Sequence, residues 1–372
     1  MGYVAVKGGT EAIEESIKRL QYERVKSGKS IEVEKIQAGM RGLVDQVMSE
    51  SSLYDETLAA LAIKQAEGNP EEAVFLLRAY RSTVPRKHYS RSIESHQMFI
   101  ERRISASFKD IPGGQILGAT TDYTHRLLNF DLSQENDDEA LKWLNSNVQS
   151  VNSEEKVKTF PKVLDYLRNE GLIIPCENND ETPDDITRES LEFPASRSAR
   201  LQVLTRGQTG TITSLGYAVI RGYGTTHPTV GELRVGTLPV TVGLPQLGTD
   251  EIDENDVYYI GELKATEVEM LMPVTAEKEL GKNEMEFEIG YGFCFGQNET
   301  KAIAMGILDY CLEHPNTDFP SHNEEFVLYH IDSVESTGFI SHLKMPHYVT
   351  FQSKLDSVRK TKQQEKEEVA SV

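Results

Sequence analysis

Three arginines and two serines lie in the stretch from Phe193 to Arg206, which reads FPASRSARLQVLTR. Arg197 and Arg200 are three residues apart and therefore share one face of a helix. Ser196 and Ser198 supply hydroxyl donors near the expected helix start, where free backbone N–H groups also favour anions. This pattern predicts an anion-binding site, although an exposed basic helix face explains it equally well.

A second arginine-bearing segment runs from Glu101 to Gly118 and reads ERRISASFKDIPGGQILG. Its Ile-Pro-Gly-Gly stretch predicts a sharp turn, and two adjacent glycines allow a backbone to approach a ligand closely. Arg102 and Arg103 can bind phosphate oxygens through bidentate hydrogen bonds. A turn beside a salt-bridged helix is the alternative explanation.

A third segment, IRGYGTTHPTVGELRVG, spans residues 220–236 and surrounds three ionisable side chains with glycines. The proline after His227 restricts the backbone on both sides of the bond, so this histidine is held stiffly. Such a side chain can act as a proton donor, and Glu232 and Arg234 follow closely. A structural histidine in a turn fits the pattern as well.

Two histidines near the carboxyl end, His342 and His347, are five residues apart with Pro346 between them. They do not share a face of a regular helix, but a bend at the proline can turn both rings toward one metal ion. Zinc usually takes four ligands, so a partner chain or a substrate would have to supply the others. Spacing alone favours a structural role over metal binding.

Several familiar motifs are absent or incomplete. The segment Gly28-Lys29-Ser30 resembles the end of a Walker A loop, but Glu23 stands where the motif requires glycine. The glycines of residues 290–296 are spaced one residue too widely for a dinucleotide fingerprint and predict a strand end that turns into a helix at Glu299. The sequence has no GxSxG or HExxH motif, which argues against the common hydrolase and zinc-protease classes.

Cysteine content and net charge exclude further classes of protein. The three cysteines include no CxxC pair, which argues against a disulfide framework, a four-thiolate zinc site and an iron–sulfur cluster held by this chain alone (Cys176, Cys294 and Cys311). A formal charge of −20 disfavours nucleic acid as a partner. No stretch approaches the roughly 20 apolar residues that span a bilayer, and the amino terminus does not resemble a secretory signal. We therefore expect a cytoplasmic protein without a membrane segment.

The predicted secondary structure consists of helices first and a mixture of helices and strands later. Apolar periodicity predicts helices over residues 11–26, 55–65, 71–81, 196–206, 299–312 and 323–334, and from 349 into the tail. Runs rich in Val, Leu, Thr and Tyr predict strands over residues 230–243 and 257–272. Because helices and strands segregate, the predicted fold class is α+β.

At 372 residues the chain is long enough for two domains. We predict a mainly helical domain over residues 1–130 and an α+β domain over 191–360 that holds the candidate substrate and metal sites. Residues 131–190, rich in acidic and amide side chains apart from a helical island at 163–168, are predicted to be a linker or peripheral insertion. The tail, 361–372, is expected to fray.

Taken together, these segments resemble the I subunit of the bacterial carbon–phosphorus lyase complex. The resemblance covers nearly the whole chain and is weakest over residues 131–180. Two positions depart from the family pattern: Thr226 stands where Asn is typical, and Ala195 where Cys is typical. These departures weaken any catalytic role for those two side chains. The matching blocks are YVAVKGG, EEAVFLLRAYR, ERRISASFKDIPGGQILG, TDYTHRLL, PDDITR, RGYGTTHP, GYGFCFGQNETKAIAM and EEFVLYHIDSVESTGFISHLKMPHYVTFQ.

The resemblance implies a reaction and partners. With three other subunits, the family displaces adenine from MgATP with an alkylphosphonate, giving ribose 1-alkylphosphonate 5-triphosphate, and the I subunit is thought to release the base from ATP or GTP. Magnesium would arrive with the ATP. A separate radical S-adenosylmethionine subunit breaks the carbon–phosphorus bond. The pair His342 and His347 is implied to bind zinc at the interface with that subunit, and self-association within the complex is expected.

Substitution at the ribose anomeric carbon passes through an oxocarbenium-like state, as in glycoside cleavage. We therefore predict that arginines bind the phosphate and phosphonate oxygens and that His227 or Glu232 is the acid; the arginines are Arg197, Arg200 and Arg234, with Arg102 and Arg103 as further substrate ligands. One rival reading is a non-catalytic dimeric scaffold that presents a partner's active site. A nucleotide-binding regulator without turnover is a third.

Overall fold

The computed structural model describes residues 8–148, 160–176, 181–223, 227–245, 252–278, 282–345 and 348–370. These residues divide into two compact units. The first unit comprises Met1–Thr83, Arg206–Gln208 and Leu328–Val372, and the second comprises Val84–Thr205 and Thr209–Val327. The two units are described separately below.

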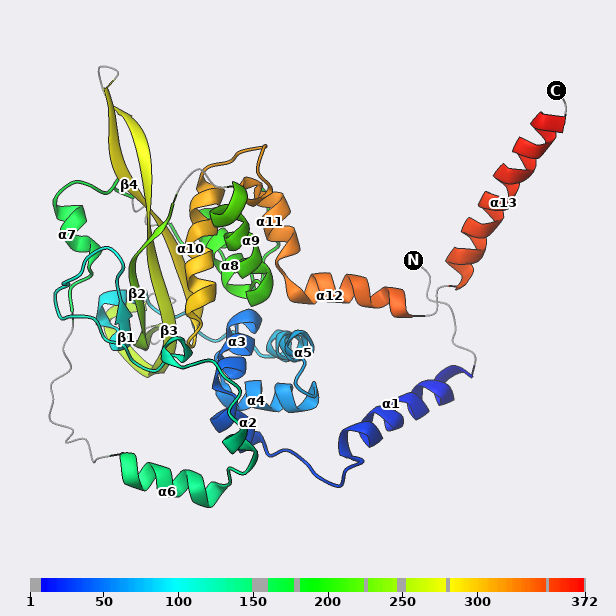
Figure 1. Cartoon of the computed structure of the whole chain (residues 1–372), viewed down its shortest axis with the longest axis horizontal. Helices are drawn as coiled ribbons and strands as arrows, with labels where there is room; N and C mark the ends of the chain where they lie inside the picture. Colours follow the sequence, from blue (N-terminus) through cyan, green and yellow to red (C-terminus); the bar gives the residue numbers. More distant parts are fainter. Residues whose placement is uncertain are drawn as a thin grey trace. The chain divides into compact units, whose positions relative to one another are not determined.

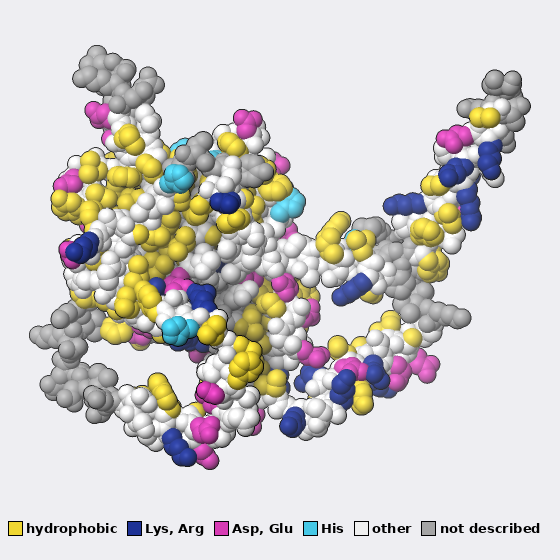
Figure 2. Space-filling view, in the orientation of Figure 1, with side chains coloured by type: hydrophobic (Ala, Val, Ile, Leu, Met, Phe, Trp, Pro, Cys, Tyr) yellow, Lys and Arg dark blue, Asp and Glu magenta, His cyan; other side chains and the backbone are white. Residues whose placement is uncertain are grey.

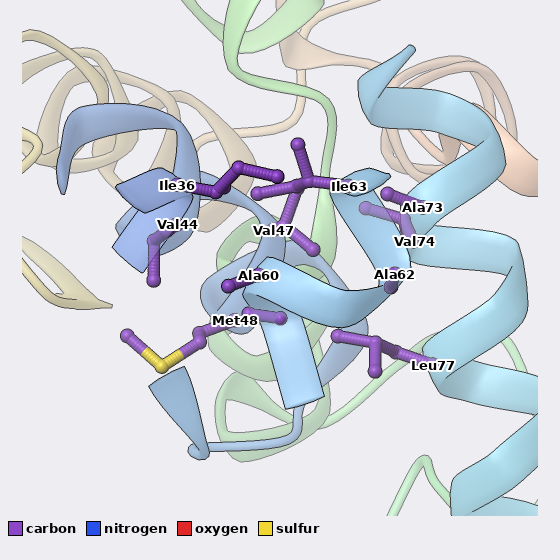
Figure 3. Packing of buried hydrophobic residues seen from close by; sticks show 11 residues of the cluster. Ile36, Val44, Val47, Met48, Ala60, Ala62, Ile63, Ala73, Val74 and Leu77 are labelled. Atoms are coloured by element: carbon purple, nitrogen blue, oxygen red, sulfur yellow. The ribbon is translucent and has the colours of Figure 1, made fainter. Parts of the chain in front are cut away.

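The first unit is helical (Figure 1). Helices α2 to α5 enclose a core of small and branched apolar side chains, among them Val47, Ala60, Ile63 and Val74 (Figure 3). Asp55 begins α4 because its side chain accepts a hydrogen bond from the backbone N–H of Leu58. The helices are α1 (Gly9–Val25), α2 (Val33–Gly39), α3 (Arg41–Ser51), α4 (Glu56–Gln65), α5 (Pro70–Thr83), α12 (Ser333–Ser341) and α13 (Tyr348–Ala370).

Two arginines and a carboxylate hold distant segments of the first unit together. The Arg78 guanidinium donates to both oxygens of Asp332, at 2.8 and 2.6 Å, and to the carbonyl oxygen of Glu50. Arg206 lies 3.4 Å from the same carboxylate. Asp332 also begins α12 by accepting the backbone N–H groups of Val334 and a neighbour.

The second unit is built on a four-stranded antiparallel sheet in the order β1-β2-β3-β4 (Figure 1). The strands are β1 (Phe99–Ile104), β2 (Thr229–Pro245), β3 (Ile252–Lys278) and β4 (Lys282–Phe295). The helices assigned to this part of the chain are α6 (Asp137–Asn147), α7 (Leu164–Asn169), α8 (Arg197–Arg206), α9 (Thr209–Ala218), the π-helix η4 (Val219–Tyr223), α10 (Glu299–Glu313) and α11 (Glu324–His330). Short 3₁₀ turns complete the chain: η1 (Ser95–Gln97), η2 (Thr121–Tyr123), η3 (Phe130–Ser133), η5 (Pro320–His322) and η6 (His342–Lys344).

Helix α10 covers one face of this sheet at very short range. A Cβ atom on Gly290 would lie 1.9 Å from the carbonyl oxygen of Gly306, and one on Gly292 would lie 1.9 Å from that of Ala302. Side chains alternate between the two faces of a strand. Tyr291, between these two glycines, therefore points to the face opposite α10.

The α+β fold class is confirmed, and so are the predicted helices at α1, α4, α5, α8 and α10 and the strands β2 and β3. The segment 290–296 ends β4 and leads to α10, as predicted. Two expectations were wrong. The expected single helix over 323–334 is broken into α11 and α12, because Asp332 starts a new helix. The first third, expected to be mainly helical, contains strand β1.

The predicted domain boundaries remain a prediction. The 131–190 region contains α6 as well as the expected island at α7, and α13 runs through the stretch expected to fray. Within the described residues, no helix combines the length and the apolar character needed to cross a bilayer.

Candidate functional site

The sheet face opposite α10 carries a buried network of charged side chains. Arg234 on β2 is paired in register with Glu267 on β3, and its Nε donates to that carboxylate at 3.0 Å. Arg103 on β1 donates from Nε to Glu232 at 2.6 Å. These four side chains are at most 2% exposed. Desolvation of so many charges is tolerated only because the charges pair with one another.

The segment 160–163 covers this charged face. Lys162 Nζ lies 3.2 Å from Glu267 and 3.3 Å from Glu269. The backbone N–H of Val163 donates to Glu232 at 2.9 Å. The Phe160 ring lies over the Arg103 guanidinium, 5.4 Å from its centre. Glu267 is therefore surrounded by cations. Burial alone would raise the pKa of Glu267, but the charges of Arg234 and Lys162 together with its hydrogen bonds hold that pKa below its usual value.

The glycine turn predicted to approach a ligand lies against protein instead. A Cβ atom on Gly113 would come within 2.1 Å of the Phe160 ring, and Gly113 has a φ of +83°. Arg103 donates to the carbonyl oxygen of the preceding Pro112. In this structure, the Ile-Pro-Gly-Gly turn therefore packs closely against the Phe160 side chain.

At the outer edge of β4, the buried carboxylate of Asp309 joins a strand to two helices. Asp309 belongs to α10 and is fully buried; it accepts the backbone N–H of Tyr291 at 2.9 Å and the Arg197 guanidinium of α8 at 2.7 Å. Burial alone would lower the pKa of Arg197, but the hydrogen bond and charge of Asp309 raise it above its ordinary value. Arg197 is thus a fixed cation with 32% of its side chain exposed.

Arg197 lines the larger of two neighbouring cavities in the second unit, with a volume of about 890 Å³. Its other lining cation is Arg168, whose Nη2 donates to Glu269 at 2.7 Å. Tyr291 is a neutral donor, because burial and then the charge of Glu267 raise its pKa well above the usual value. The lining residues are Arg168, Ile173, Ile174, Pro175, Cys176, Arg197, Ser198, Leu201, Glu288, Ile289, Tyr291, Tyr310, Glu313 and His314.

A second cavity of about 440 Å³ shares part of this wall. Cys311 lies in it but is no nucleophile, because burial raises the pKa of its thiol to about 12. The lining residues are Val219, Pro228, Met272, Ile307, Tyr310, Cys311, Glu313, His314, Pro315, Asn316 and His322.

His314 follows α10 and lines both cavities. Its Nδ1 lies 2.8 Å from the carbonyl oxygen of Tyr310, and its Nε2 lies 3.0 Å from the Glu288 carboxylate. Its ring packs against that of Tyr310, with centroids 4.3 Å apart and the ring planes tilted by 34°. A histidine held by a carboxylate beside a cavity is a common arrangement for proton transfer.

Of the predicted residues that the structure describes, Arg197 is the one that lines either cavity. Arg200, on the same helix, is paired with Glu313, which lines both cavities. Arg102 pairs with Glu299 at 2.8 Å. His227 is exposed and is followed by Pro228, which lines the second cavity.

Sequence reasoning missed Arg168, Tyr291, Tyr310 and His314. Arg168 was noted only as the end of a helical island, and Tyr291 only as part of a glycine-rich strand end. The alternation of Gly290, Tyr291 and Gly292 was a usable signal, since glycines on one face imply that the tyrosine points to the other.

The predicted zinc pair can be described only in part, since His347 lies outside the described residues. The Nδ1 atom of His342 contacts the carbonyl oxygen of Phe339, a type of contact that metal-bound histidines also make. Among the residues described, no group of three or more His, Cys, Asp or Glu side chains is arranged to hold a metal ion.

The fold and the cavities define an α+β protein with an arginine-lined pocket suited to an anionic organic ligand. The chain belongs to the family described as bacterial phosphonate metabolism protein (PhnI), whose sequence pattern matches residues 2–365.

Three relatives extend over nearly the full length of the chain. HtxH of Stutzerimonas stutzeri is 44% identical over 367 residues, which is 97% of this chain and 96% of the relative. Two proteins named alpha-D-ribose 1-methylphosphonate 5-triphosphate synthase subunit PhnI are similar to the same extent. The one from Rhizobium meliloti is 42% identical, covering 97% of this chain and 95% of its own. The one from Escherichia coli is 41% identical, covering 98% and 99%.

Proposed function

We propose that this chain is a cytoplasmic subunit of a ribose 1-methylphosphonate 5-triphosphate synthase in a carbon–phosphorus lyase complex, and that it carries the nucleosidase step. In the complete reaction an alkylphosphonate oxygen displaces adenine from the ribose of MgATP; when the chain acts alone as a nucleosidase, water takes the place of the phosphonate. The names of the Rhizobium and Escherichia relatives support the synthase role. The nucleosidase step goes beyond those names and is the activity that the family resemblance implies.

The observation that carries this assignment is the 890 Å³ cavity, in which Arg197 and Arg168 face the same space. Its volume suits a ligand of nucleotide size. Arginine binds phosphate and phosphonate oxygens through two parallel hydrogen bonds. Because Asp309 already fixes Arg197, little side-chain freedom is lost when an anion binds.

In the proposed reaction, the bond between the anomeric carbon and the base nitrogen breaks, and its electron pair leaves with the base. A phosphonate oxygen supplies the electron pair of the new carbon–oxygen bond. Holding the acceptor against the sugar lowers the barrier by removing the entropic cost of encounter. Arg197 and Arg168 would hold the anionic groups in place, and magnesium enters with the triphosphate as part of the substrate.

Four other arginines are still predicted to bind substrate, and Glu232 is still a predicted acid, but the ion pairs of these side chains limit their access to a ligand. The four arginines are Arg102, Arg103, Arg200 and Arg234. Arg103 and Glu232 are paired with each other at 2.6 Å. Arg234 is 1% exposed and paired with Glu267. Direct contact with substrate would require these pairs to separate, so we propose that they act chiefly by holding the sheet beneath the cavity.

We also propose that His342 and His347 contribute to a zinc site completed by the radical S-adenosylmethionine subunit. Metal-bound histidines usually make a second contact to a carbonyl or carboxylate oxygen, and His342 makes such a contact with Phe339. Zinc at that position would hold two chains together.

A scaffold role is the second candidate, favoured by apolar side chains that lie exposed on isolated helices. Figure 2 shows hydrophobic side chains at the surface of α1 and α13. Ile17 and Leu20 of α1 are 61% and 64% exposed, and Phe351 of α13 is 62% exposed. Exposed apolar surface of this kind marks sites of protein association, which include self-association and contacts with other subunits.

The deciding experiment measures release of free base from ATP and GTP by the purified chain and by the assembled complex. If the chain carries the nucleosidase step, the parental proteins release base, and the variants Arg197→Lys and Arg168→Gln release it at least about tenfold more slowly, since a lost charged hydrogen bond is worth roughly 1.5–3 kcal/mol. Arg359→Gln, an exposed arginine of α13, is the matched control.

A scaffold would release no base from the isolated chain, and the arginine variants would leave the activity of the complex unchanged. Binding without turnover would instead support a nucleotide-dependent regulator. Either result would overturn the assignment.

A further inference from the structure

The two cavities of the second unit are neighbours whose linings overlap. Three residues, Tyr310, Glu313 and His314, line both of them. A ligand with one end in each cavity would therefore lie beside His314. A nucleotide has two chemically different ends, and two adjacent cavities can sort them.

The cavities differ in charge. The larger one is lined by Arg168 and Arg197, whereas the described lining of the smaller one contains no arginine or lysine. The smaller cavity instead has apolar side chains such as Met272 and Ile307, together with the amide of Asn316. An amide can both donate to and accept from the edge of a purine ring, and the Tyr310 ring adds an aromatic surface.

We propose that the smaller cavity takes the purine base, that the larger one takes the anionic end of the nucleotide, and that His314 donates a proton to the departing base. This inference rests on the proposed function and names the site of its chemistry. The anomeric carbon would then lie beside the shared wall.

The contacts of His314 suit this role. A carbonyl oxygen faces Nδ1 and a carboxylate faces Nε2, at 2.8 and 3.0 Å. Both neighbours are hydrogen-bond acceptors, so the protonated ring donates to both. Packing against the tilted Tyr310 ring and the Nδ1 bond hold the ring in place. Glu288, the partner of Nε2, lines the larger cavity, so Nε2 has to leave this carboxylate to reach a base in the smaller cavity.

The proton balance of the step is simple. As the bond between carbon and base breaks, the proton on Nε2 of His314 moves to a ring nitrogen of the base, which leaves as neutral purine. His314 becomes neutral, while Glu288 remains a carboxylate. The side chain of His314 is 41% exposed, so it can regain a proton from water before the next turnover.

The test compares leaving groups in the assembled complex. Adenine and guanine need a proton as they leave, whereas the base of 7-methylguanosine triphosphate already carries a positive charge and leaves as a neutral molecule. We expect His314→Asn to slow base release from ATP and GTP by roughly 100-fold or more, the usual contribution of a general acid. The same variant should release 7-methylguanine within about threefold of the parental rate. The asparagine amide can retain the hydrogen bond to Tyr310, which limits structural damage.

Two further variants complete the design. His96→Asn changes a histidine with 59% of its side chain exposed that lines neither cavity, and should match the parent with every substrate. His227→Asn tests the acid predicted from the sequence. If His227→Asn shows the selective loss and His314→Asn does not, the assignment of His314 is overturned.

Equal slowing of all three substrates by His314→Asn would also overturn it, because a residue that only supports the fold does not distinguish leaving groups. Failure of the proposed function gives a different result, in which the parental complex itself releases no base from any of the three nucleotides.

Discussion

The buried carboxylate of Asp309 accepts the Arg197 guanidinium at 2.7 Å from one oxygen and at 3.3 Å from the other. The partners are unequal: Asp309 is fully buried, while Arg197 is one-third exposed and lines the larger cavity. The carboxylate therefore fixes the arginine while part of the guanidinium remains open to solvent or ligand. Helix α10 in this way sets the position of a side chain on α8.

Asp309→Asn should weaken both the fold and anion binding. The neutral amide keeps an oxygen for the N–H of Tyr291 but loses the charge that holds Arg197. We expect a loss of about 1–3 kcal/mol in the free energy of unfolding, which is the range for a damaged buried hydrogen bond, measured by urea denaturation. Adding Arg197→Gln should cost less than the sum of the single changes; strict additivity would contradict the coupling.

Cys176 and Cys311 should differ in their rates of alkylation. Cys176 is exposed and its thiol lies 3.4 Å from an Arg197 nitrogen. Cys311 is buried with its pKa raised to about 12, so little thiolate forms near neutral pH. Iodoacetamide should therefore modify Cys176 first, as read by mass spectrometry of peptides, and inorganic triphosphate in the larger cavity should slow that reaction. Early modification of Cys311 in folded protein would contradict its burial.

Acid should remove a contribution of Asp332 to the stability of the first unit. Burial alone would raise the pKa of Asp332, but the charges of Arg78 and Arg206 together with its hydrogen bonds hold the pKa in the folded chain below its usual value. A lowered pKa stabilises the fold above the unfolded-state value of about 3.9, and the contribution is lost as the pH falls through the folded-state value.

The free energy of unfolding of Asp332→Asn should therefore differ most from that of the parent near pH 7. The difference should shrink below roughly pH 4, as followed by urea denaturation across that range. Asp356→Asn, with 64% of its side chain exposed, is the control and should show no such dependence. A constant difference at all pH values would show that shape, not charge, explains the loss.

Gly292→Ala should displace α10 from the sheet. The added methyl group would lie 1.9 Å from the carbonyl oxygen of Ala302, and backbone cannot move aside cheaply. We expect a loss of several kcal/mol, at or above the usual 1–3 kcal/mol for overpacking, with lower base release if the cavities carry the activity. Gly42→Ala, in α3 with open space around it, should instead be neutral or stabilising by up to about 1 kcal/mol. Thermal denaturation of both variants checks the contrast.

Local patterns predicted most elements because their causes are local. Apolar periodicity located α4 and α10, and capping residues such as Asp55 mark their ends. The failures have non-local causes. The segment Phe99–Ile104 reads as a continuation of helical sequence until its pairing with β2 is known. The Asp332 cap that splits α11 from α12 is coupled to Arg78, 254 residues away in the sequence.

The candidate site was less accessible to sequence reasoning. An arginine bound to a carboxylate and an arginine open to a ligand look alike in a sequence, and Arg103 and Arg197 differ only in their surroundings. Tyr291 and His314 come from β4 and from the end of α10 and meet only in the folded unit. Of the predicted arginines, Arg197 alone lines one of the two neighbouring cavities, and no local pattern distinguishes it.

The charged face of the sheet limits how this protein can change. Lys162, Arg103 and Arg234 are matched against Glu232, Glu267 and Glu269 in a space from which water is largely excluded. Replacing one member of a pair leaves the opposite charge buried and unpaired, whereas exchanging both members for apolar side chains of similar volume is often tolerated. Libraries of single substitutions should therefore yield few folded variants at this face. Libraries that vary both members of a facing pair together should yield many more.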